Sequence, residues 1–141
     1  MLKEALIKIK GTQCLGEESD ITELTTFGKF GIKNGSYFIS YDESELSGMK
    51  NVKTGIFVRQ DDTVVIKRTG ELESTLEVEN GKRSMCFYNT DAGILEIGVF
   101  GEKVINGLSL NGGTLKMEYN IDSNLRLISK NTVEITVREV N

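Results

Sequence analysis

Hydrophobic and polar residues alternate with a period of two through most of this chain. Residues 71–79, ELESTLEVE, carry glutamate and threonine at one set of alternate positions and leucine, serine and valine at the other. Residues 115–122, LKMEYNID, repeat the pattern. Neighbouring side chains of a β-strand point to opposite faces, so this period indicates strands with one buried face. Because no stretch shows the helical recurrence over a useful length, the pattern predicts an all-β protein.

Short runs of asparagine, aspartate and glycine separate these segments and predict a series of hairpins. The turn signals are Asn34-Gly35, Asp61-Asp62, Asn80-Gly81, Asp91-Ala92-Gly93 and Asn111-Gly112-Gly113. Asn106-Gly107 is expected to be a bulge, because the segments on either side are too short to pair well. We expect strands, some of them merging, at about 3–13, 20–33, 36–44, 53–60, 63–69, 71–79, 82–90, 94–100, 103–110, 114–122 and 125–138.

Hairpins that follow one another without long crossovers favour a single antiparallel meander closed as a β-barrel of about 8–10 strands. A two-layer sandwich is the alternative architecture. Closure would pair the last strand with the first and remove exposed strand edges. The inward residues at this junction would be Ala5, Ile7 and Ile9 from the first strand and Val133, Ile135 and Val137 from the last.

Turn geometry predicts where the polar side chains point. A two-residue type I′ turn at Asn80-Gly81 would place Arg83 opposite Val78 and set Arg83 and Asn89 on the inner face. Met85 and Phe87 would share that face, with Cys86 outside. A three-residue turn at 91–93 would then keep Glu96 outside, which avoids a desolvated carboxylate, and direct Leu95, Ile97 and Val99 inward.

Six polar side chains are therefore candidates to contact a ligand inside the barrel: Arg83, Tyr41, Tyr119, Tyr37, Glu43 and Asn89. Each has a second interpretation. The tyrosines suit core positions with their hydroxyls at the rim. Arg83 lies near a turn, where its stem can cover apolar surface while its guanidinium reaches water. Asn89 can bond the loop backbone, and Glu43 can be an exposed loop acid.

Four apolar side chains are expected on the outer surface instead: Phe38, Tyr88, Ile94 and Phe100. Together they would exceed the scattered apolar surface that is normal for a monomer. They are candidates for an interface with another protein or a second copy of the chain.

Composition limits the partners and the compartment. The 141 residues predict one domain spanning 1–141, and no apolar run reaches the roughly 20 residues of a membrane helix. The net charge is −4, with 17 basic residues spread among 21 acidic ones, so neither nucleic acid nor a membrane is an expected partner. The two cysteines and the absence of an export signal predict a cytoplasmic location.

The chain contains no histidine, and this removes the most common general base and metal ligand. Cys14 and Cys86 lack a second cysteine at metal-binding spacing, and no glycine-rich nucleotide motif is present. We therefore expect no metal site, no cofactor and no catalytic residues.

Three segments resemble the YwiB-like family of bacterial domains: KIKGTQ (8–13), YFISYDESELSGM (37–49) and GKRSMCFYNTDAGILEIGVFGEK (81–103). The resemblance runs along nearly the whole chain and implies a calycin-type, lipocalin-like β-barrel in a bacterial cytoplasm. The family is one of unknown function, so no functional residue carries over. The chain lacks the tryptophan that true lipocalins have near the first strand.

Three functions follow from these observations. The leading hypothesis is a barrel that binds a small, mainly apolar molecule with a polar head. The first alternative is a filled barrel that acts as an interaction module or homodimer. The second is a histidine-independent enzyme, which the sequence does not favour because no nucleophile and base lie together in a motif.

Overall fold

The computed structural model describes residues 2–43, 51–71, 73–90 and 93–140. Within these residues the chain forms ten β-strands and no α-helix. The expected segments 94–100 and 103–110 merge into one long strand, β8. The strands are β1 (Leu2–Leu15), β2 (Glu18–Lys33), β3 (Ser36–Asp42), β4 (Val52–Val58), β5 (Val64–Gly70), β6 (Ser74–Val78), β7 (Arg83–Thr90), β8 (Gly93–Ser109), β9 (Gly112–Ser123) and β10 (Arg126–Glu139).

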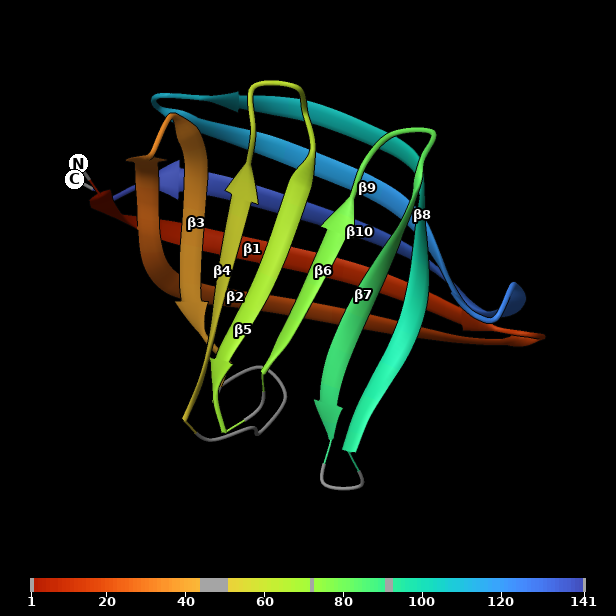
Figure 1. Ribbon diagram of the computed structural model, residues 1–141. Coiled ribbons are helices and arrows are strands. Elements are labelled where there is room, and N and C mark those ends of the chain that lie inside the picture. The colour runs from red at the N-terminus through yellow and green to blue at the C-terminus, as the bar shows by residue number, and fades with distance from the viewer. Residues whose placement is uncertain (1, 44–50, 72, 91–92, 141) are drawn as a thin grey trace.

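The strands pair with their sequence neighbours in antiparallel fashion and close into a barrel through β1 and β10. This confirms the predicted all-β meander and its closure. At the junction Ile7 lies opposite Val137 and Ile9 opposite Ile135, and all four side chains are buried. Figure 1 shows the two chain termini at the same end of the barrel, where β1 and β10 run side by side.

The Asn34-Gly35 hairpin has the predicted geometry. Both residues adopt positive φ angles, 53° and 80°, as a type I′ turn requires. The resulting register places Phe30 opposite Ile39 and Ile32 opposite Tyr37, also as expected. This turn therefore determines which face of β3 points into the barrel.

The Asn80-Gly81 hairpin departs from the prediction. The turn closes as expected, with the Lys82 amide donating to the Glu79 carbonyl at 3.1 Å, but only Gly81 has a positive φ, so the turn is not type I′. Further along, Thr75 pairs with Phe87, although continuing the register of the turn would pair it with Cys86. One extra residue in β7 accounts for this shift, as in a β-bulge.

That one-residue shift reverses the faces of β7. Met85 and Phe87 are exposed and Cys86 is buried in the core, so the predicted inward positions of Met85 and Phe87 were wrong. A shift of one residue has this effect because side chains alternate strictly along a strand.

The β7–β8 hairpin agrees with the prediction in part. Ile97 and Val99 are buried and Glu96 is exposed, as expected, whereas Leu95 is exposed. Thr90 pairs with Gly93, so Gly93 belongs to β8 and its place in the predicted three-residue turn was wrong; residues 91–92 of that turn lie outside the described residues. The register shift of β8 against β9 falls between Gly101 and Lys103, so the bulge expected at Asn106-Gly107 was misplaced.

The hydrophobic core fills the end of the barrel that holds the chain termini. Its largest fully buried side chains include Phe30, Ile7, Ile39, Leu115, Met117 and Val58. Towards the opposite end, the strands carry inward polar residues in place of this packing. That end contains the candidate site.

Candidate ligand cavity

A cavity of about 620 Å³ lies inside the barrel. Its lining comes from strands β1–β6, β9 and β10, and from Glu43, which directly follows β3. The volume lies within the range of pockets that hold small molecules. Among the described residues, the interior is therefore packed at one end and opens into a pocket at the other.

Apolar side chains form much of the cavity wall: Ile9, Ile56, Ile66, Leu76, Val133 and Ile135. All of them occupy the inward positions of their strands, as the period-two pattern requires. Such a wall favours an apolar occupant, because burying hydrocarbon gains about 0.8 kcal/mol per methylene.

One row of polar residues crosses β3–β6 on the inner face. Register places Tyr41 opposite Thr54, Thr54 opposite Arg68, and Arg68 opposite Ser74. Residues opposite each other on antiparallel strands have neighbouring side chains on the same face. The sequence therefore brings a phenol, two hydroxyls and a guanidinium together on one wall.

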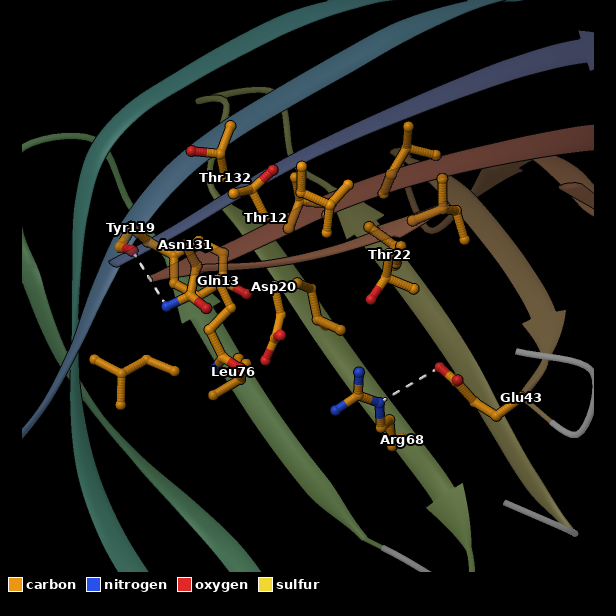
Figure 2. Close-up of a pocket in the computed structure, with 18 of the residues that line it drawn as sticks. Thr12, Gln13, Asp20, Thr22, Glu43, Arg68, Leu76, Tyr119, Asn131 and Thr132 are labelled. Atoms are coloured by element: carbon orange, nitrogen blue, oxygen red, sulfur yellow. Dashed lines mark hydrogen bonds and ion pairs between the residues drawn. The ribbon is translucent and has the colours of Figure 1, made fainter. Parts of the chain in front are cut away.

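Glu43 lies at the end of this row. Its side chain is only 2% exposed; it accepts a hydrogen bond from the Thr54 hydroxyl and forms an ion pair with Arg68, whose Nε lies 3.5 Å from Glu43 Oε1. A buried carboxylate needs such partners to offset the loss of water. The Arg68 side chain is 28% exposed and reaches into the cavity beside Glu43 (Figure 2).

Tyr41 is also buried, and its phenol pKa is raised well above the ordinary value. Burial is the larger cause, and the nearby negative charge of Glu43 adds to it. The hydroxyl therefore stays protonated at neutral pH, and it shares a hydrogen bond with the side chain of the neighbouring Thr54.

A second polar row crosses β2, β1, β10 and β9 on the facing wall. Asp20 pairs with Gln13, Gln13 with Asn131, and Asn131 with Tyr119. The buried Asn131 amide donates to the Ser129 hydroxyl at 3.0 Å and to the Tyr119 carbonyl at 3.5 Å. Figure 2 shows this group on the other side of the cavity from Glu43 and Arg68.

Three of the six predicted ligand contacts line the cavity: Tyr41, Tyr119 and Glu43. Tyr37 does not, because it stacks on Phe30 in the filled part of the barrel, with ring centroids 6.0 Å apart. The side chain of Asn89 lies outside the described residues.

Arg83 points away from the cavity, contrary to the expected inward position. Its Nε and Nη2 donate to Asp122 Oδ2 and Oδ1 at 2.9 and 2.6 Å on the outer face. The pair lies over Gly98, where an added Cβ would collide with both side chains. The hydrogen bonds between Arg83 and Asp122 lower the pKa of the Asp122 carboxyl and raise the pKa of the Arg83 guanidinium. The β7 bulge is the physical reason for this outward position.

The four apolar residues predicted on the outer surface differ in how exposed they are. Phe38 is only 8% exposed, because Phe57 packs on its ring at a centroid distance of 4.6 Å and Lys33 lies above it. Its expected place in an exposed patch was therefore wrong. Ile94 is exposed, Phe100 is half-buried, and the side chain of Tyr88 lies outside the described residues. Exposed Met85 and Phe87 extend this face.

Arg68, Gln13, Asp20 and Asn131 were missed from the sequence. The period-two pattern contained the signal for Arg68, because it follows Val64 and Ile66 at alternate positions of the predicted strand 63–69. Gln13, Asp20 and Asn131 lie near the ends of long hairpins, where polar residues on both faces hide the alternation.

No group of three metal-binding side chains occurs in the described part of the chain. The same residues contain no helix with the length and apolar character needed to span a membrane.

The fold and family have known counterparts. The crystal structure of the ywiB protein from Bacillus subtilis is similar with a TM-score of 0.85 and 18% sequence identity, over 99% of this chain and 94% of that one. This likeness confirms the calycin-like barrel. No curated protein matches the chain. The family model described as domain of unknown function (DUF1934) matches residues 7–135. The chain therefore belongs to the DUF1934 family, as its resemblance to the YwiB-like domains predicted.

Proposed function

We propose that this protein binds a small, mainly apolar molecule with a polar head inside its barrel. The observation that carries the proposal is a cavity of about 620 Å³ whose wall combines isoleucine, leucine and valine side chains with polar groups gathered in two rows. Apolar walls with a few convergent polar groups are typical of ligand pockets.

The apolar and the polar residues of the cavity wall have different roles in ligand recognition. The apolar wall accounts for most of the affinity through burial of the hydrocarbon part. Arg68 orients the head, because its guanidinium carries N–H donors on the inner face. We favour binding over catalysis, because the raised pKa of Tyr41 makes the phenol a poor base at neutral pH.

We also propose a bacterial cytoplasmic location. Cys14 and Cys86 are both free thiols, and Cys86 is buried in the core. Free thiols are typical of a reducing compartment. Labelling of the protein with a membrane-impermeant thiol reagent in intact and lysed cells tests this, and labelling of Cys14 in intact cells would contradict it.

Filling the cavity tests the binding proposal. Gly11 lines the cavity, and a Cβ built on it meets no atom within 4 Å, so Gly11→Phe adds a ring without a backbone clash. Lys8→Phe is the matched control, since it adds the same ring to an exposed position of β1. The readout is the fluorescence of Nile red, a neutral apolar dye, titrated with each folded variant.

We expect the wild-type protein and Lys8→Phe to bind the dye alike and Gly11→Phe to weaken binding at least tenfold. Equal binding by all three proteins would place the dye elsewhere and contradict the proposal.

A homodimer is the second candidate function. On the outer face, Met85, Phe87 and Ile94 are 46%, 55% and 71% exposed, and they belong to one β-hairpin. Apolar side chains clustered in this way are typical of interaction sites. Sedimentation equilibrium would test it with Phe87→Ser and, as a control, Phe27→Ser, which removes an exposed ring from β2. Loss of dimer only in Phe87→Ser supports this candidate, and a monomeric wild type rejects it.

A further inference from the structure

We infer that the polar head of the ligand is a singly charged carboxylate bound by the terminal nitrogens of Arg68. This inference rests on the proposed function and names the ligand class of the same cavity. It follows from the orientation of Arg68, the burial around it and the charges of the cavity wall.

Glu43 fixes the orientation of Arg68. The Nε edge of the guanidinium faces the buried Glu43 carboxylate at 3.5 Å. In Figure 2 the two terminal nitrogens lie on the side away from Glu43 and point into the cavity. A guanidinium is planar and presents its N–H groups as a fork that matches a carboxylate in two parallel hydrogen bonds. Glu43 thus acts as a positioning residue.

The surroundings strengthen this interaction. On the inner face Arg68 lies opposite the buried residues Thr54 and Ser74, and Ile66 precedes it at the next inward position of β5. Burial reduces screening by water, so a charge-assisted hydrogen bond is stronger there than at the surface. The Tyr41 hydroxyl shares a hydrogen bond with Thr54, its cross-strand neighbour on the same wall.

The charges of the cavity favour a single negative charge over two. Among the residues that the structure describes, its lining contains one guanidinium, Arg68, and two carboxylates, Glu43 and Asp20. Asp20 lies on the facing wall and is exposed to water, so its charge is partly screened. A phosphate monoester, with about −1.5 to −2 charges at pH 7, would meet more repulsion from these carboxylates than a carboxylate would.

Three probes with one tail test the head group: decanoate, decanol and decyl phosphate, each titrated calorimetrically into the full-length protein below its micelle concentration. We expect decanoate to bind most tightly. Arg68→Gln should weaken decanoate binding about 10-fold to 100-fold, the size of a charged hydrogen-bond pair, and leave decanol binding unchanged.

Matched variants separate the role of Arg68 from general effects on the fold. Arg83→Gln removes an arginine from the outer face and should change no affinity. Arg68→Lys keeps the charge but loses the fork, so we expect an intermediate loss for decanoate. Asp20→Asn removes a negative charge from the cavity wall, so it should reduce the difference in affinity between decanoate and decyl phosphate. Melting curves confirm that each variant is folded. If Arg68→Gln does not fold, Arg68→Lys replaces it as the test variant.

The outcomes distinguish this inference from the proposed function. If decanoate and decanol bind equally and Arg68→Gln changes neither, the carboxylate assignment is overturned while the binding cavity stands. Tighter binding of decyl phosphate overturns the assignment of a single charge. If none of the three probes binds and Nile red is also rejected, the proposed function fails together with this inference.

Discussion

Tyr41 is a phenol whose surroundings favour its neutral form. Burial and the charge of Glu43 both raise its pKa, so the folded protein holds the phenolic proton more tightly than the unfolded chain does. An unfolded tyrosine ionises near pH 10. The stabilising contribution of Tyr41 is therefore complete below about pH 10 and is lost as the pH rises further.

The Tyr41→Phe variant tests this linkage. We expect the difference in unfolding free energy between wild type and variant to be constant from pH 7 to about pH 9 and to shift against the wild type above about pH 10. Urea titrations at each pH supply the measurement. A difference that stays constant through pH 11 would contradict the assignment.

Asp122 has the opposite dependence on pH. Hydrogen bonds from Arg83 are the largest cause of its lowered pKa, and the Leu125 amide adds a further hydrogen bond at 3.1 Å. Its contribution to stability is thus present above the unfolded pKa near 3.9 and is lost as the pH falls through the folded pKa.

We expect Asp122→Asn to be less stable than wild type at pH 6 and to approach wild-type stability as the pH falls below about 4. Arg83→Met should reproduce much of this behaviour without affecting dye or decanoate binding, because Arg83 lies on the outer face. Loss of ligand binding in Arg83→Met would contradict the outward position of Arg83 and support the inward position that the sequence predicted.

At the scale of the element, Gly28 and Gly98 differ in the kind of atom that an added Cβ would meet. A Cβ at Gly28 would collide with the Ser40 carbonyl oxygen and with the Ile7 side chain inside the barrel. At Gly98 the three atoms nearest to an added Cβ belong to the charged groups of the Arg83 and Asp122 side chains. A backbone carbonyl in a ladder cannot move aside as a side chain can.

Gly28→Ala should therefore lose more stability than Gly98→Ala. For Gly28→Ala we expect a loss of about 2–3 kcal/mol, in the range of overpacked cores. In the Gly98→Ala background, Asp122→Asn should no longer lower the free energy of unfolding at pH 6, because the added Cβ already displaces the Arg83–Asp122 pair. Chemical denaturation of the two variants and the double variant with Asp122→Asn measures both effects, and equal losses would contradict this account.

The predictability of each element depended on its turn. Alternation and turn residues were enough to predict the strands, the closure of β1 on β10 and the Asn34-Gly35 hairpin. The same residue type at Asn80-Gly81 did not reveal the bulge that follows, because one inserted residue leaves the alternating pattern of β7 intact while exchanging its faces. Arg83 was misplaced for this reason.

At the scale of the whole molecule, the sequence predicted a closed barrel but not its hollow end. Whether a barrel is filled depends on the side-chain volumes that meet inside it. The two polar rows form only when β3–β6 and β9, β10, β1 and β2 curve round to face each other (Figure 1). Asp20 and Arg68 are far apart along the chain and lie on facing walls of the cavity.

The central claim is that this cavity holds a ligand. Native mass spectrometry of the protein, purified gently from its own cells alongside Gly11→Phe and Lys8→Phe, tests it most directly. We predict an adduct of a few hundred daltons on wild type and Lys8→Phe, released on denaturation and missing from Gly11→Phe. Wild-type protein without an adduct, or the same adduct on Gly11→Phe, would contradict the account.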